Sequence, residues 1–106
     1  MTANDLTKLV RELLGYHAHT VWRGNAGYVK SNVKLAPKGT PDLIGYGPNG
    51  RFVGFEIKVG RDAVRESQAE WMRDASDKGV FCRVIRSLED IEEALVEFDY
   101  YKDGGW

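Results

Sequence analysis

The 106-residue sequence contains a single cysteine, Cys82, so no disulfide can form within the chain. A lone cysteine inside an apolar stretch fits a reducing compartment. No apolar run approaches the roughly 20 residues that a membrane-spanning helix needs, and the N-terminus lacks the pattern of a signal peptide. We therefore expect a cytoplasmic protein with no membrane partner.

Internal repeats, linkers and low-complexity tracts are also missing. The length fits one domain, because single domains commonly contain about 100–150 residues. We expect residues 1–106 to form this single domain, and the role of the tail, 100–106, is left open.

Acidic residues are missing from one long stretch, between Glu12 and Asp42, although the whole chain has a formal net charge of −1. From Ser87 onward the balance reverses, and acidic residues far outnumber the single lysine, Lys102. The candidates for phosphate contacts in the first stretch are Arg23, Lys30, Lys34 and Lys38. One basic and one acidic side suit a phosphate-binding surface. A solvated, lysine-bearing loop explains the basic stretch equally well.

Hydrophobic periodicity predicts most of the secondary structure. Helices are expected at Asn4–Leu14, ended by Gly15, at Arg65–Lys78, ended by Gly79, and at Leu88–Phe98, capped by Ser87 with Asp90 three residues on. Strands are expected at Pro41–Tyr46, Arg51–Lys58 and Val80–Arg86. Residues 16–22 have some strand character, and a short strand is expected near Tyr28–Leu35. The apolar face of the last helix is expected to comprise Leu88, Ile91, Leu95 and Phe98.

This order of elements predicts an α/β fold. The strands at 41–46 and 51–58 form an antiparallel hairpin, and the following strand–helix–strand step forms a parallel crossover. We therefore expect a mixed β-sheet flanked by helices, in the order α-β-β-β-α-β-α.

The turn between the hairpin strands decides which side chains meet. Pro48-Asn49-Gly50 favours a three-residue loop, because proline suits a type I turn and glycine the left-handed closing position. That loop places Asp42 directly opposite Glu56 on one face of the sheet. Lys58 lies two residues further and therefore points to the same side.

Two adjacent carboxylates repel each other, and a divalent cation resolves the conflict. Two carboxylates, a main-chain carbonyl and waters suit Mg²⁺, with Mn²⁺ as a substitute. Such a metal polarises a phosphate, and Lys58 would position or deprotonate the attacking water. Taken singly, Glu-x-Lys on a strand is usually a solvated ion pair, and Pro-Asp before a strand is usually a turn.

The motifs Gly39-Thr40-Pro41-Asp42 and Glu56-Ile57-Lys58, followed by Gln68 at the start of a helix, resemble those of VRR-NUC domains in the PD-(D/E)xK nuclease superfamily. The resemblance extends from Leu6 to about Leu95. It implies a restriction-endonuclease-like core and, in stand-alone phage-type members, a homodimer that cuts Holliday junctions in DNA repair and recombination. It also implies a bacterial or phage-infected host cell.

The resemblance further implies roles for individual residues. Asp42 and Glu56 would be metal ligands, together with the main-chain carbonyl of Ile57. Lys58 would be the catalytic lysine, and Gln68 would orient that lysine or a phosphate. Glu12 matches a glutamate that the family carries on its first helix, although a surface role is nearly as compatible.

Several readings stay open on the sequence alone. The first is a Mg²⁺-dependent endonuclease that acts on branched DNA, and flaps, nicks or duplex ends are alternative substrates. The second is a non-catalytic nucleic-acid-binding module on the same fold. Arg61 and Arg65 are further candidates for DNA contacts. His17 and His19 lack a third ligand nearby, so we expect them on the surface or facing DNA, and Cys82 is expected to be buried.

Overall fold

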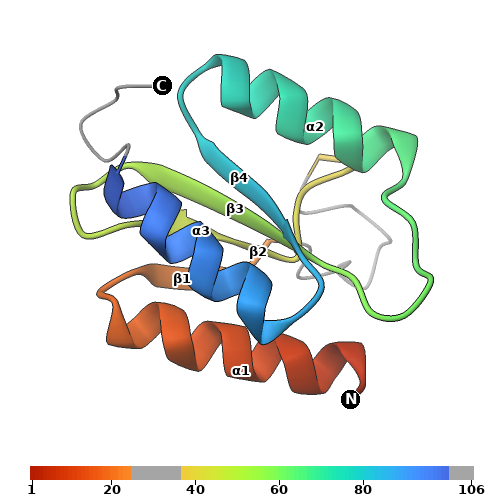
Figure 1. Ribbon diagram of the computed structural model, residues 1–106. Helices are drawn as coiled ribbons and strands as arrows, with labels where there is room; N and C mark the ends of the chain where they lie inside the picture. The colour runs from red at the N-terminus through yellow and green to blue at the C-terminus, as the bar shows by residue number, and fades with distance from the viewer. Residues whose placement is uncertain (25–36, 101–106) are drawn as a thin grey trace, which may run out of the picture.

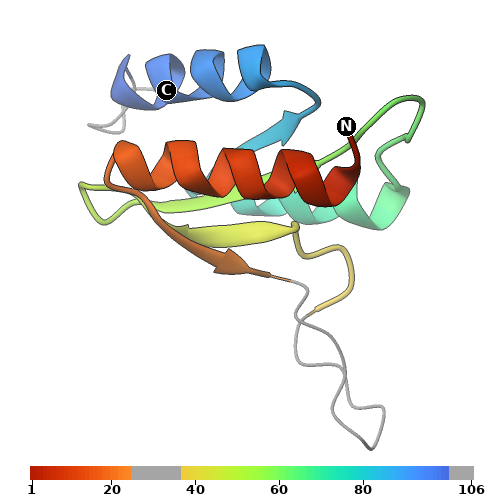
Figure 2. The ribbon, with the colours of Figure 1, turned by 90° about the horizontal axis from the view of Figure 1, so that it is seen from below.

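The structure is a computed structural model that describes residues 1–24 and 37–100. Its elements are α1 (Ala3–Tyr16), β1 (Thr20–Arg23), β2 (Leu43–Tyr46), β3 (Phe52–Ile57), α2 (Glu66–Asp77), β4 (Phe81–Ile85) and α3 (Leu88–Tyr100). The four strands form one sheet, with α1 and α3 on one face and α2 on the other (Figures 1 and 2).

The strand order in the sheet is β1-β2-β3-β4. The pairs β1/β2 and β2/β3 are antiparallel, whereas β3 and β4 are parallel and are joined through α2. The predicted mixed sheet flanked by helices is therefore confirmed, and so is the predicted parallel crossover.

The loop between β2 and β3 has the predicted length of three residues. The amide of Gly47 donates a hydrogen bond to the carbonyl of Arg51 at 2.8 Å, which closes the loop. Gly50 has a φ of +82°, the left-handed conformation that favours glycine. The resulting register pairs Tyr46 with Phe52 and Leu43 with Phe55.

The hydrophobic core lies between the sheet and the pair α1/α3. Alternate residues of β3 point into it, because successive side chains of a strand face opposite sides. Its buried members from the strands are Leu43, Val53, Phe55, Ile57, Phe81 and Ile85, and those from the helices are Leu6, Val10, Leu14, Ile91, Ala94, Leu95 and Phe98. The opposite face of β3 is therefore left for Gly54 and Glu56.

Helix α1 runs one residue past Gly15, where the sequence predicted its end. The amide of Ala18 donates to Gly15 and that of His19 donates to Leu14, which is the Schellman pattern of a helix C-terminus. The left-handed position of this motif is filled by Ala18, with a φ of 62°, and not by a glycine. A non-glycine residue at that position costs about 1 kcal/mol.

Helix α3 buries a slightly different face from the one predicted. Leu88 is 40% exposed, and Ala94 takes a place in the core beside Ile91. The hydroxyl of Ser87 accepts the predicted capping bond from the amide of Asp90. The carboxylate of Asp90 accepts from the amide of Arg86, one residue before the expected cap position.

The expectation for His19 was wrong, whereas His17 is exposed as expected. The His19 ring is buried and lies edge-on to the ring of Phe98, with centroids 4.6 Å apart. Burial lowers the pKa of His19, so the neutral ring is favoured. Cys82 is buried as expected, and burial raises the pKa of its thiol.

Some predictions fall on residues outside the described ranges. These are the short strand near Tyr28–Leu35, the phosphate contacts of Lys30 and Lys34, and residues 101–106 of the tail. Within residues 1–24 and 37–100, no helix is both long enough and apolar enough to cross a membrane.

Candidate active site

Asp42 and Glu56 lie close together at the open end of the β2–β3 hairpin, away from its loop. Leu43 pairs with Phe55, so the next pair in this register is Asp42 with Glu56. The Oδ2 atom of Asp42 accepts a hydrogen bond from the amide of Ile57 at 2.8 Å. The side chain of Asp42 thereby replaces a main-chain acceptor of the β2/β3 ladder, just before β2 begins. The predicted position of Asp42 opposite Glu56 is confirmed.

Glu56 is a buried carboxyl group in an unfavourable setting. It is 1% exposed, and burial is the main reason that its pKa rises to about 9. The hydrogen bond from its side chain to Asp42 and the negative charge of Asp42 raise the pKa further. The positive charges of Lys58 and Arg65 act in the opposite direction but do not outweigh these effects.

The second oxygen of Glu56, Oε2, is buried and has no hydrogen-bond partner among the described residues. Buried polar atoms are normally paired, because an unpaired one costs about 1–3 kcal/mol. An unpaired carboxylate oxygen beside a second carboxylate is the arrangement that a bound cation satisfies.

Lys58 follows β3 and is 7% exposed. Its amide donates to the carbonyl of Ile85 at 3.0 Å, so the parallel β3/β4 ladder fixes its backbone one residue beyond the strand. It lies two positions after Glu56, which places both side chains on the same side of the strand. A buried lysine beside a buried carboxyl group is not the solvated ion pair that Glu-x-Lys usually forms.

The third predicted metal ligand is the main-chain carbonyl of Ile57, and Pro41 affects which donors that carbonyl can meet. The β2/β3 ladder ends at the pair Leu43–Phe55, and the chain bends at Asp42, so Pro41 lies outside the ladder. Proline has no N–H, so Pro41 cannot donate a hydrogen bond to the carbonyl of Ile57. The amide of the same residue is already bonded to Asp42. This arrangement suits the carbonyl for another partner, such as a cation.

The donor set fits a small, hard divalent cation. Two carboxylates and one main-chain carbonyl are oxygen ligands, and Mg²⁺ commonly takes one or two carboxylates and keeps several waters. Among the described residues, no cluster of three or more histidine, cysteine or acidic side chains could hold a metal. A site built on Asp42 and Glu56 would therefore rely on the carbonyl of Ile57 and on water.

The loop before Asp42 is pressed against the start of α2. Gly39 has a φ of +88°, and a Cβ atom there would lie 2.1 Å from the carbonyl oxygen of Ser67. Thr40 is buried, and its hydroxyl donates to the carbonyl of Pro37 at 2.6 Å. Glycine is therefore required for the contact that brings the Gly-Thr-Pro-Asp loop beside the first turn of α2.

Gln68 occupies that first turn. Its Oε1 atom accepts a hydrogen bond from the amide of Arg65 at 2.8 Å, so it caps α2. This bond leaves the amide nitrogen of Gln68 as the group for any contact with Lys58 or a phosphate. The guanidinium of Arg65 lies close enough to Glu56 to favour its ionised form.

The remaining predicted residues are dispersed. Arg61, Lys38 and Arg23 are exposed, as a contact with DNA requires. Glu12 is exposed on α1, on the rim of a surface hollow that also involves Arg23, and it joins no metal-ligand cluster within the described part of the chain.

Sequence reasoning missed the polar residues of α1 that line this hollow. Asn4, Thr7, Lys8 and Arg11 recur at positions i, i+3, i+4 and i+7, so they form one stripe of the helix. The spacing was used only for the apolar stripe of the same helix. The same spacing, applied to the polar residues, would have shown this second stripe with its two cations, Lys8 and Arg11.

The protein was compared with known families and structures. No protein-family model matches the sequence, and no curated protein sequence matches it. Among solved structures, a chain described as a VRR_NUC domain is similar to this one, with a TM-score of 0.69 and 19% sequence identity. The similarity covers 92% of this chain and 97% of that chain. The chain therefore has the fold of a VRR_NUC domain, as its motifs indicated.

Gly39 and Gly50 provide a matched pair of substitutions. Both have a positive φ, but a Cβ atom at Gly50 would meet nothing within 4 Å. We predict that Gly50→Ala costs about 1 kcal/mol in the free energy of unfolding, from backbone strain alone. Gly39→Ala should cost clearly more, because the loop must also move away from Ser67. Equal unfolding midpoints in urea would contradict this account of the loop.

The pKa of Glu56 predicts how stability depends on pH. The unfolded chain loses this proton near pH 4.5, whereas the folded chain keeps it up to about pH 9. Folding therefore takes up a proton in this range, and the free energy of unfolding falls as the pH rises through it. Glu56→Gln should remove that decline. Urea unfolding of both proteins with a chelator present measures it, and parallel pH profiles would contradict the assignment.

Proposed function

We propose that the protein is a Mg²⁺-dependent endodeoxyribonuclease that hydrolyses phosphodiester bonds in branched DNA, with Holliday junctions as its preferred substrate. The observation that carries the proposal is the buried carboxyl group of Glu56, which lies beside Asp42 and has an oxygen without a partner among the described residues. A fold that only binds DNA gains nothing from this destabilising pair, whereas a metal site requires it.

Asp42, Glu56 and the carbonyl of Ile57 would hold the cation, with Mn²⁺ able to replace Mg²⁺. A divalent cation held there polarises the phosphate and lowers the pKa of a water molecule. The site is at the end of the hairpin, so a DNA strand would approach past the Gly39–Asp42 loop and the start of α2.

Lys58 would add a positively charged side chain beside the proposed cation. Its Nζ atom would hold the attacking water and stabilise the negative charge that builds on the phosphate. The water would lose a proton as its oxygen bonds to phosphorus, the bond to the leaving sugar oxygen would break, and that oxygen would take up a proton, so that water is split between the two products. Arg65 and the amide nitrogen of Gln68, at the start of α2, would contact a phosphate oxygen.

The preference for Holliday junctions rests on the resemblance of the motifs to stand-alone VRR-NUC domains. A homodimer suits such a substrate, because two symmetric sites cut two strands at matching positions. Flaps, nicks or duplex ends are alternative substrates of the same chemistry. A non-catalytic DNA-binding module on this fold is the competing hypothesis, and it requires neither Lys58 nor a metal.

We predict that the purified protein cleaves a synthetic four-way junction with Mg²⁺ or Mn²⁺ and not with a chelator. Lys58→Ala should lower the rate at least about 100-fold, since charge stabilisation and water positioning both depend on it. Asp42→Asn should lower it comparably. Gel assays on a junction, a flap, a nicked duplex, a plain duplex and a single strand measure both activity and preference.

Lys78→Ala is the matched control. This lysine is exposed and paired with Asp74 at 3.0 Å. It directly follows α2, whereas the candidate site lies beside the first turn of that helix, at its other end. The variant should cleave at the rate of the unaltered protein. Full activity in Lys58→Ala would refute the assigned site, and metal-independent binding without cleavage of any substrate would favour the binding module.

A further inference from the structure

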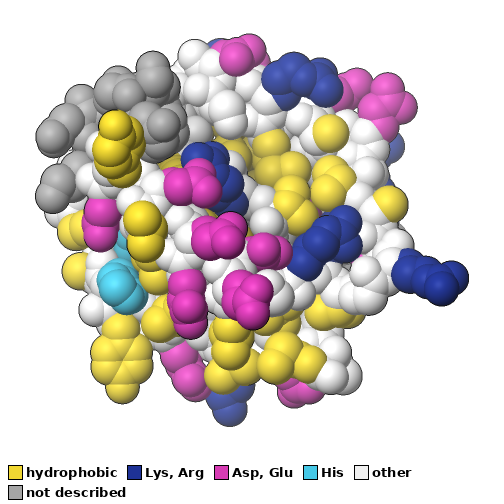
Figure 3. Space-filling model, viewed as in Figure 1, with side chains coloured by type: hydrophobic (Ala, Val, Ile, Leu, Met, Phe, Trp, Pro, Cys, Tyr) yellow, Lys and Arg dark blue, Asp and Glu magenta, His cyan; other side chains and the backbone are white. Residues whose placement is uncertain are grey.

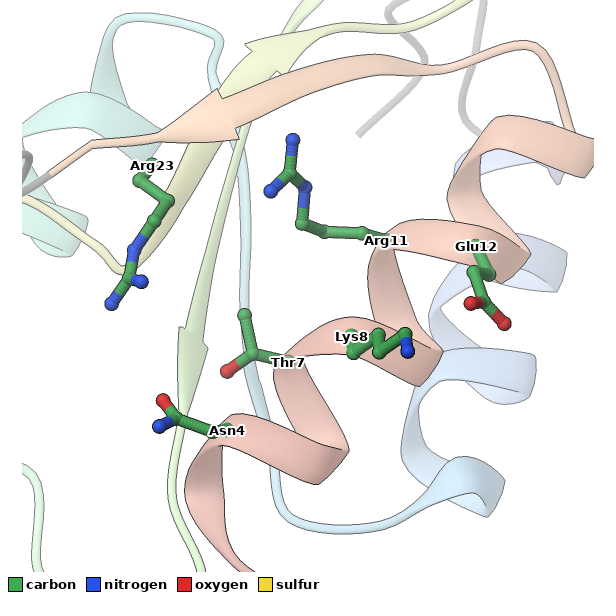
Figure 4. A pocket seen from close by; sticks show the side chains of 6 residues that line it. All are labelled: Asn4, Thr7, Lys8, Arg11, Glu12 and Arg23. Atoms are coloured by element: carbon green, nitrogen blue, oxygen red, sulfur yellow. The ribbon is translucent and has the colours of Figure 1, made fainter.

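A surface hollow lies between α1 and the end of β1. Its volume is about 460 Å³, and its lining residues are Asn4, Thr7, Lys8, Arg11, Glu12 and Arg23. Figure 4 shows Arg11 of α1 and Arg23 of β1 extending into the space between helix and strand. Two guanidinium groups from different elements therefore line one concave surface.

The hollow carries a net positive charge. Lys8, Arg11 and Arg23 are exposed, and none of them forms an ion pair with another described residue. Two carboxylates lie near: Asp5, which interacts with Lys8, and Glu12, which Figure 4 shows pointing away from Arg23. The carboxylate of Glu12 therefore does not occupy the space between Arg11 and Arg23, where an anion could bind.

Backbone hydrogen bonds connect β1, which carries Arg23 of the hollow, to β2 and to Asp42 of the candidate active site. Arg23 pairs with Leu43, and the amide of the next residue, Gly24, donates to the carbonyl of Asp42 at 2.9 Å. Adjacent strands lie about 4.8 Å apart. The backbones of Arg23 and Asp42 therefore lie close together at one end of the sheet, but Arg23, as the partner of Leu43, faces α1, whereas Asp42 and Glu56 face the opposite side. The hollow and the candidate site thus lie at the same end of the sheet, on its two faces.

We propose that this hollow binds the phosphodiester backbone of the DNA a few nucleotides from the bond that is cut. Arg11 and Arg23 would bind phosphate oxygens, Lys8 would add charge, and the amide of Asn4 would donate a hydrogen bond. The proposal extends the proposed nuclease function, on which its reference to a cut bond rests.

The chemistry of the lining favours a phosphate chain. Guanidinium groups bind phosphate through paired hydrogen bonds, and no aromatic residue among those described lines the hollow to stack on a base. Along one DNA strand, phosphates recur about every 3.4 Å of helix axis, so a strand that passes around this end of the sheet would present phosphates a few nucleotides apart to the site and to the hollow. The face over α3 is unsuitable, because acidic side chains gather there (Figure 3).

The test is DNA binding by Arg11→Ala, Arg23→Ala and the double variant, measured with a fluorescent four-way junction and a chelator, so that no cleavage occurs. Each lost phosphate contact lowers the slope of log affinity against log salt by about one. The double variant should therefore lose about two from the slope and bind severalfold more weakly. Arg11→Lys with Arg23→Lys should restore most of the slope.

Arg73→Ala is the control, since Arg73 is an exposed arginine on α2. It should bind as the unaltered protein does, and all variants should unfold at the same urea concentration within error. An unchanged affinity and slope in the double variant would overturn the proposal. So would an equal loss in Arg73→Ala, or no DNA binding by the unaltered protein.

The same assay separates this proposal from the nuclease function. If the unaltered protein binds DNA through the hollow but cuts no substrate with Mg²⁺ or Mn²⁺, the nuclease function fails and the phosphate site stands. If it cuts DNA and the double variant binds with normal affinity and slope, the hollow fails and the nuclease function stands.

Discussion

The site depends on one unfavourable pairing, the approach of two carboxyl groups across the β2–β3 hairpin. Asp42 is tied to the amide of Ile57, and Glu56 is buried beside it with a pKa of about 9. The rest of the fold holds the pair in place. The three-residue loop fixes the register, the core fixes the orientation of β3, and α2 fixes the loop that carries Asp42. A bound cation would relieve the repulsion that these constraints impose.

Two charged regions surround this site with opposite signs. Helix α3 contains no lysine or arginine and carries six acidic residues, several of them exposed. The cations of α1 and β1 lie together at a hollow beside Asp42. A DNA backbone would be repelled by the first region and attracted by the second. The nearly neutral net charge therefore conceals a distribution that would guide a DNA backbone toward the hairpin end.

The hairpin was predictable because its turn residues and its alternating pattern agree on one register. The positions of Asp42, Glu56 and Lys58 followed from that agreement. The end of α1 was not predictable from Gly15, since the Schellman motif fell three residues later, at Ala18. Periodicity on α3 did not distinguish Leu88 from Ala94, because burial depends on where the helix crosses the sheet. The capping bond of Gln68 is local, three residues along the chain, whereas the burial of His19 against Phe98 is a tertiary contact that no local pattern encodes.

The central claim is that the buried carboxyl pair is a divalent-cation site, and calorimetric titration with Mn²⁺ tests it most directly. At neutral pH, metal binding must displace the proton of Glu56, so the measured heat should depend on the ionisation enthalpy of the buffer. The account predicts binding to the unaltered protein with release of about one proton, and loss of both in Glu56→Gln. Equal binding by the two proteins, with no proton released, would contradict it.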